Sequence, residues 1–82
     1  MNQEDIVNLV TMIFKEVFPE LKSKELNLDK KQEEFENWDS FSHMEIISAV
    51  EHRFKLSLDT QEVIAIDSPR KLIEIIAKKI QK

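Results

Sequence analysis

The chain has 82 residues, no cysteine and no glycine, and a formal net charge of −4 with 34% charged residues. A chain of this length forms one domain, here residues 1–82, with a small hydrophobic core. Without cysteine it has neither disulfides nor thiolate metal ligands, which favours a cytoplasmic protein, and no apolar run approaches the roughly 20 residues of a membrane span. We therefore expect a single cytoplasmic domain without a membrane segment.

The charge is unevenly distributed along the chain. Residues 69–82 contain five basic residues and one acid, whereas the preceding residues contain 7 basic and 15 acidic ones, a net −8. Nucleic-acid binding requires a basic surface, so an acidic body of this kind argues against it. The acidity suits a basic protein partner, or only solubility.

The lack of glycine and the spacing of the apolar residues predict an all-α fold. A first helix is expected over about residues 3–18, capped by Asn2 and ended by Pro19. The apolar residues of this helix, spaced by three and four, are Ile6, Leu9, Val10, Ile13, Val17 and Phe18.

Residues 19–38 form a charged connection that exceeds the usual length between helices. We therefore expect this connection either to contain a short helical turn or to have a functional role of its own. Leu26, Leu28 and Phe35 are expected to reach the core from this connection, and Trp38 to anchor the chain as it enters the next helix.

A second helix is expected over about residues 40–54. Its expected buried stripe is Phe41, Met44, Ile47, Val50 and Phe54, and its expected exposed side is Glu45, Ser48, Glu51 and His52. His43 is expected to be a polar surface residue of the first turn.

Two further helices complete the expected fold. Asp59, followed by Glu62 three residues later, predicts the start of a short helix that runs to about residue 66. Asp67 or Ser68 then caps a last helix with Pro69 at its first position. The apolar residues of this last helix are Leu72, Ile73, Ile75, Ile76 and Ile80. The prediction is a small four-helix bundle with three longer helices, one short helix and a long first connection.

The segment Asn-Trp-Asp-Ser-Phe-Ser-His over residues 37–43 holds most of the chemically versatile side chains. Asp39, Ser40 and His43 lie too close together at one helix start to form an ordered hydrolytic triad, and no glycine is present for a nucleophile elbow. His43 and His52 are nine residues apart, out of phase on one helix, and have no cysteine to complete a metal site. We therefore expect neither an enzyme nor a metal site.

Ser40 allows two interpretations from local chemistry. As a helix N-cap it would contribute about 1 kcal/mol to stability. As an exposed serine at the positive end of a helix, it would lie where an attached phosphate group is electrostatically favoured. The residues themselves leave both interpretations open.

The same residues resemble the acyl carrier protein family. In that family an Asp-Ser pair precedes an amphipathic helix with acidic residues five and eleven positions after the serine, which here are Asp39, Ser40, Glu45 and Glu51. The later segment "LSLDTQEVIAIDSPRKLIEII" is also similar to the family, and the resemblance extends from about Ile6 to Ile80.

The resemblance implies that Ser40 receives a 4′-phosphopantetheine arm from coenzyme A through a magnesium-dependent phosphopantetheinyl transferase, which Asp39 helps to engage. The terminal thiol of the arm would then carry an acyl or aminoacyl group as a thioester. Acyl- or aminoacyl-activating and acyl-transferring enzymes would be the partners of a monomeric, non-catalytic carrier in lipid or fatty acid metabolism. Ser42 is the less suitable attachment point because it follows phenylalanine.

Other positions are assigned by the same resemblance. Glu45 and Glu51 correspond to contacts with partner enzymes, and Phe41 and Met44 to positions that border the arm or the acyl pocket. Asn37 and Trp38 replace a glycine and a small residue of the family pattern, which favours a specialised lipid or secondary-metabolite pathway. The alternatives are a peptidyl carrier loaded with an amino acid, and a small helical interaction module that is never modified.

Overall fold

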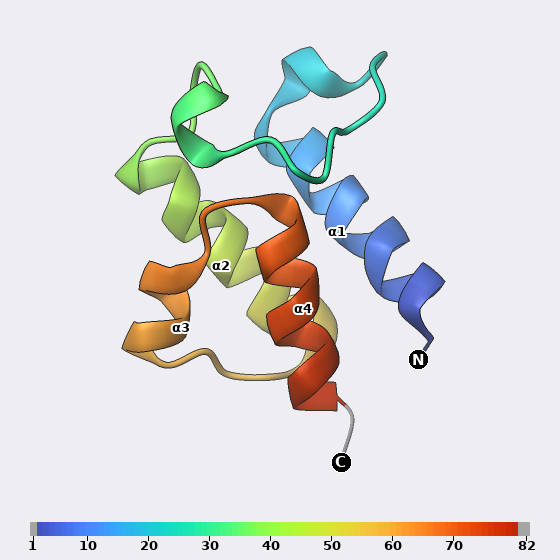
Figure 1. Ribbon diagram of the computed structural model, residues 1–82, viewed down its shortest axis with the longest axis vertical. Helices are drawn as coiled ribbons and strands as arrows, with labels where there is room; N and C mark the ends of the chain where they lie inside the picture. The colour runs from blue at the N-terminus through green and yellow to red at the C-terminus, as the bar shows by residue number, and fades with distance from the viewer. Residues whose placement is uncertain (1, 81–82) are drawn as a thin grey trace.

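A computed structural model describes residues 2–80 and contains, within that range, four α-helices and no strand. The helices are α1 (Gln3–Val17), α2 (Ser40–Phe54), α3 (Thr60–Ala65) and α4 (Pro69–Ile80), with 3₁₀-helices η1 (Pro19–Leu21) and η2 (Gln32–Glu34) between α1 and α2. In Figure 1, α4 lies in front of α2, α1 runs diagonally beside them and the short α3 lies on the opposite side from α1. The predicted all-α fold, with three longer helices and one short one, is confirmed. None of the helices in residues 2–80 is both long and apolar enough to cross a membrane.

Helix α1 begins and ends where the sequence predicts. The Asn2 side chain accepts a hydrogen bond from the Asp5 N–H at 2.8 Å, and the helix stops before Pro19. Phe14, which the predicted stripe omitted, is completely buried, whereas Leu9 is only half-buried. The buried residues of α1 are Ile6, Val10, Ile13 and Phe14.

The long connection contains two short helical turns and contributes two aromatic residues to the core. Phe35 is 8% exposed and Trp38 is 5% exposed, and both pack against Phe14 and Phe18. Ring centroids in this aromatic cluster of Phe14, Phe18, Phe35 and Trp38 are 5.1–6.3 Å apart. Its two edge-to-face pairs adopt the favoured geometry for aromatic rings. The prediction that the connection reaches the core is confirmed, and Leu26 and Leu28 also pack partly against it.

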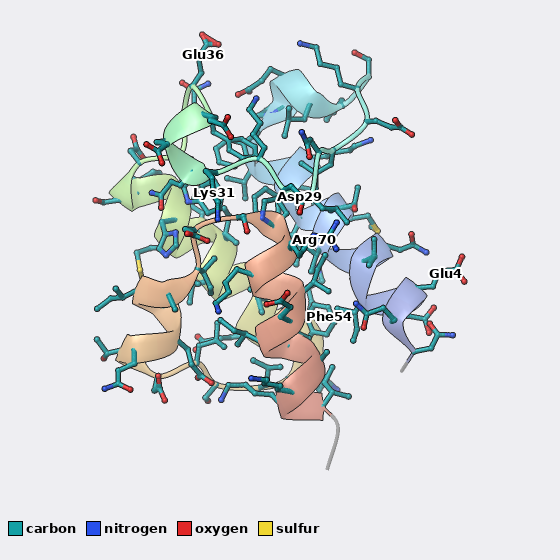
Figure 2. All side chains as sticks on the ribbon, in the orientation of Figure 1. Glu4, Asp29, Lys31, Glu36, Phe54 and Arg70 are labelled. Atoms are coloured by element: carbon teal, nitrogen blue, oxygen red, sulfur yellow. The ribbon has the colours of Figure 1, made fainter. Side chains whose placement is uncertain are left out.

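The connection is also attached to the start of α4. The Arg70 N–H donates to the Leu28 carbonyl at 2.9 Å, and the Arg70 side chain pairs with Asp29. Lys31 and Asp67 form a second ion pair at 3.6 Å. Asp29, Lys31 and Arg70 gather near the first turn of α4 in Figure 2. These contacts fix the path of the connection, and so the place where the chain enters α2.

Helix α2 is rotated from its predicted orientation. Phe41 is 75% exposed and Met44 is 52% exposed, so the prediction that both are buried is wrong. The buried face instead passes through Ile46, which lies about 200° around the helix from Met44. The buried residues are Ser42, Ile46, Ile47 and Val50, and Phe54 packs partly against the core.

Helix α3 is capped as predicted. The Asp59 carboxylate accepts from the Glu62 N–H at 2.8 Å, and the Asp59 N–H donates to the Glu62 carboxylate at 2.9 Å. No residue of α3 is buried, although Ile66, directly after it, is 1% exposed. The capping box of Asp59 and Glu62 holds the start of this helix, and Val63 packs partly against the core.

Helix α4 begins with Pro69, and Ser68 is its cap. The Ser68 hydroxyl accepts from the Lys71 N–H at 3.1 Å, which decides between the two predicted caps, while Asp67 pairs with Lys31 instead. The buried residues of the helix are Pro69, Leu72, Ile73 and Ile76.

Candidate functional site at the start of helix α2

Asp39, and not Ser40, caps α2. The Asp39 carboxylate accepts from the Ser42 N–H at 2.9 Å, and the Asp39 N–H donates to the Ser42 hydroxyl oxygen at 2.9 Å. The interpretation of Ser40 as the cap is therefore wrong. Asp39, one residue earlier, has the extended backbone of an N-cap, and Ser42 completes a capping box that the usual pattern builds with glutamate or glutamine.

Ser40 is the first residue of α2 and is exposed. Within residues 2–80 its hydroxyl takes part in no hydrogen bond, because Asp39 and Ser42 satisfy the cap without it. The first-turn N–H groups of a helix point outward and lack intrahelical partners, so this hydroxyl lies at the positive end of α2.

Ser42 differs sharply from Ser40 although only one residue separates them. It is 6% exposed, and its hydroxyl lies 2.7 Å from the Asn37 carbonyl oxygen, to which it donates. Of these two serines, only Ser40 is exposed to solvent.

The Asp39 carboxylate is ionised beside Ser40. The hydrogen bond from the Ser42 backbone N–H lowers the pKa of Asp39 below its ordinary value of 3.8, and the Ser42 hydroxyl lowers it further. A fixed negative charge therefore immediately precedes the exposed hydroxyl.

An apolar surface adjoins this site. Phe41 and Met44 line a shallow hollow of about 550 Å³ between α2 and the end of α1. The other residues of its lining are Glu16, Val17, Glu45 and Ser48. The hollow is near Ser40 in the sequence, but Ser40 is not part of its lining.

The two acidic residues assigned to partner contacts have different environments. Glu45 is exposed beside Phe41 and Met44. Glu51 is half-buried, and its carboxylate accepts from the Leu58 N–H at 2.9 Å, which fixes the chain that leads to α3. Phe41, Met44 and Glu45 thus lie on one accessible surface, whereas Glu51 already has a partner within the chain.

His43 is not the polar surface residue that the sequence suggested. It is half-buried, its Nδ1 accepts from the Trp38 Nε1–H at 2.9 Å, and its Nε2 lies 2.8 Å from the Val63 carbonyl oxygen. Both ring nitrogens therefore have partners other than Ser40. The sequence could have suggested the contact between Trp38 and His43, because the tryptophan directly precedes the helix and the histidine lies in its first turn. It could not have suggested Val63, which belongs to another helix.

In residues 2–80 no group of three or more histidine and carboxylate side chains is arranged to hold a metal ion. No protein-family model matches the chain, and no curated protein is significantly similar to it. The resemblance to acyl carrier proteins therefore stays a prediction from the sequence.

Proposed function

We propose that the chain is a carrier of the acyl carrier protein type, which holds an acyl group as a thioester on a 4′-phosphopantetheine arm attached to Ser40. The observation that carries the proposal is the exposed, unbonded Ser40 hydroxyl at the first position of α2, directly after the ionised Asp39. The helix bundle, with its long connection before this serine, supports the same proposal.

The local structure suits the arm. A phosphodiester on Ser40 would lie at the positive end of a 15-residue helix, where an anion gains about 0.3–1 kcal/mol at an exposed site. The exposed position gives the arm room to extend into solvent. Because the chain contains no cysteine, the arm would supply the thiol that carries the cargo.

The surface beside Ser40 suits docking to enzymes. Phe41 and Met44 are large apolar side chains exposed to solvent, and Glu45 adds a negative charge at their edge. Apolar anchors with a charged rim are typical of specific, transient interfaces. The phosphopantetheinyl transferase and the acyl-activating and acyl-transferring enzymes would engage this surface of α2.

The segment before Ser40 supports a carrier dedicated to a specialised lipid or secondary-metabolite pathway. Trp38 occupies the position of a small family residue, and its ring is buried in the aromatic cluster and bonded to His43. The chain that leads to Ser40 is thus held in the core by the Trp38 ring, whereas the family pattern has a glycine and a small residue at positions 37 and 38. An aminoacyl cargo is the alternative within the same carrier chemistry.

The test is incubation of the purified protein with coenzyme A, magnesium and a broad-specificity phosphopantetheinyl transferase, followed by intact mass measurement. The wild type is expected to gain one phosphopantetheine group, and Ser40→Ala none while it keeps its helical circular dichroism. Ser57→Ala is the matched control, because Ser57 is also an exposed serine but lies after α2 and outside the hollow beside Phe41 and Met44, and it should be loaded like the wild type. A wild type that gains no mass would contradict the proposal.

A second candidate function is a helical interaction module that is never modified. The exposure of Phe41 and Met44 favours it, because exposed large apolar side chains mark interaction surfaces. In that case Ser40→Ala would leave cellular function intact, whereas replacing Phe41 and Met44 with serine would abolish it.

A further inference from the structure

The hollow between α1 and α2 continues the side of α2 on which Ser40 lies. Ser40 and Met44 are four residues apart in this helix, so their side chains are neighbours on one face. Ser48 follows one turn later, about 12 Å along the helix axis from Ser40, and lines the hollow together with Met44. A group attached to Ser40 that folds back along α2 therefore passes over the hollow.

The hollow offers apolar surface to such a group. Phe41 is 75% exposed, Met44 is 52% exposed, and the half-buried Val17 adds the end of α1 to the lining. The Glu16 carboxylate, also in the lining, accepts from the Arg53 guanidinium through both oxygens, at 3.0 and 2.9 Å. Removing apolar side chains from water is favourable, so a hydrocarbon group that covers Phe41 and Met44 is stabilised there.

Side chains fill the core on the inner side of α2 and α3. Ile46 of α2 and Ile66, directly after α3, are 0% and 1% exposed. The His43 ring stacks on Trp38 with ring centroids 5.8 Å apart, and its Nε2 lies 2.8 Å from the Val63 carbonyl oxygen of α3. A chain that entered the bundle between α2 and α3 would have to move packed side chains apart, whereas a chain on the hollow displaces only water.

A second large hollow is less suited to hydrocarbon. It has a volume of about 470 Å³ and lies beside the connection before α2. The aromatic rings that line it are buried, since Phe35 is 8% exposed and Trp38 is 5% exposed. Its accessible side chains include the ion pair of Lys31 and Asp67 and the exposed Glu33. A hydrocarbon chain there would take charged groups out of water, which is unfavourable, so the hollow between α1 and α2 is the better site.

We propose that the hollow between α1 and α2 holds the acyl group carried by the arm on Ser40, and that this acyl group is an uncharged hydrocarbon chain. The inference rests on the proposed function, because the arm brings the acyl group to the hollow. Glu16 and Glu45 in the lining repel an acyl group that ends in a carboxylate. The stabilisation grows with each CH₂ group that leaves water, so a longer chain is held better than an acetyl group.

The tether makes a shallow hollow sufficient. Attachment to the same molecule raises the local concentration of the acyl group to the millimolar range, so weak apolar contacts keep it on the hollow. Phe41 and Met44 are also the side chains that a docking enzyme would cover. An enzyme that docks there would therefore displace the acyl group from the hollow and free it for transfer.

The direct test compares loaded forms of the protein by nuclear magnetic resonance. A broad-specificity phosphopantetheinyl transferase attaches the arm from octanoyl-coenzyme A or acetyl-coenzyme A to protein with ¹³C-labelled methyl groups. The octanoyl form should shift the Val17 and Met44 methyl signals relative to the acetyl form. Shifts of the Ile46 and Ile66 methyl signals instead would place the chain in the core and overturn the proposal, as would identical spectra of the two forms. A succinyl form, which ends in a carboxylate, should match the acetyl form, and an equal effect of succinyl and octanoyl would refute the preference for an uncharged chain.

A second test does not depend on the transferase. Because the chain contains no cysteine, Ser40→Cys provides a single thiol, to which an octyl group on a flexible maleimide linker can be coupled. The octyl group should shift the Val17 methyl signals, and Met44→Ser should abolish this shift. Ile64→Ser is the matched control, since Ile64 is 75% exposed but lies on α3 and outside the lining, and it should keep the shift. An unchanged shift in Met44→Ser, or no shift in either background, would overturn the proposal.

The two tests separate this inference from the proposed function. If the transferase does not load the wild type but the coupled octyl group shifts the Val17 signals, the carrier function fails although the hollow binds hydrocarbon. If loading succeeds and neither chain shifts the signals of the hollow, the carrier function stands and this inference fails.

Discussion

Asp39 and Ser42 hold each other at the start of α2 through two hydrogen bonds of 2.9 Å, each residue donating its backbone N–H to the side chain of the other. Ser40 lies between them and takes no part. The structure therefore distinguishes Ser42, which stabilises the fold, from Ser40, two positions earlier, whose hydroxyl is exposed and available for modification.

The two serines should respond oppositely to replacement by alanine. Ser42→Ala removes the partner of the Asp39 N–H and of the Asn37 carbonyl, which should lower the free energy of unfolding by about 1–3 kcal/mol. Ser40→Ala removes an exposed, unbonded hydroxyl, and the change should stay within about 0.5 kcal/mol. Urea unfolding followed by circular dichroism measures both. Equal losses for the two variants would show that the capping assignment is wrong.

The cap should make stability depend on pH through Asp39. Its folded-state pKa is lowered, first by the Ser42 N–H, so the ionised cap stabilises the fold fully above the ordinary value of 3.8. That contribution is lost as the pH falls through the lower folded-state value. Asp39→Asn keeps a capping side chain but removes the titration. Between pH 5 and pH 2 the melting temperature of the wild type should fall further than that of Asp39→Asn.

Other carboxylates with lowered pKa values titrate in both proteins and so cancel in this comparison. They are Glu20, Asp29 and Glu62. If the melting temperatures of the wild type and Asp39→Asn fell equally between pH 5 and pH 2, the ionised Asp39 cap would not contribute to stability as we predict.

Phe14 should be among the most important residues for stability. It is completely buried and contacts Phe18, Phe35 and Trp38. Phe14→Ala should cost about 3–5 kcal/mol, a large share of the 5–15 kcal/mol that a small domain has. Met12→Ala, on the same helix but 50% exposed, should change stability by about 0.5 kcal/mol or less. Denaturant unfolding compares the two, and similar losses would place Phe14 outside the core.

Lys55 should be a site where glycine stabilises the protein. It ends α2 with φ 54° and ψ 52°, the left-handed conformation that glycine adopts without the steric penalty of a side chain. Lys55→Gly should raise the melting temperature by roughly 2–8 °C after the entropic cost of glycine in the unfolded chain. Lys55→Ala retains the β-carbon and should give no such rise. A lower melting temperature for Lys55→Gly would contradict the backbone assignment.

Local signals in the sequence were sufficient to predict the helices. Pro19, Pro69 and the pair Asp59 and Glu62 act within one turn of the chain, and the helix boundaries they predict agree with the structure within about one residue. The rotation of α2 was not predictable in this way. Met44 and Ile46 fit a helical apolar pattern about equally well, and only the tertiary packing of the helices places Ile46 in the core.

The candidate site was predictable only where it depends on local signals in the sequence. The helix start at residues 39–40 and the exposure of Ser40 follow from local chemistry. Ser42 differs from Ser40 because it forms hydrogen bonds with Asp39 and with the Asn37 carbonyl. The motif alone does not reveal these bonds. The bond between His43 and Val63 joins residues 20 apart in sequence and required the tertiary structure.

The central claim is that Ser40 carries a phosphopantetheine arm in the cell. The most direct measurement is fragmentation mass spectrometry of the protein purified from its native source, which reads the modified residue and any attached cargo together. The account predicts one phosphopantetheine group on Ser40, with an acyl or aminoacyl thioester on part of the population. A protein whose Ser40 is unmodified throughout, or a modification on Ser42 instead, would contradict it.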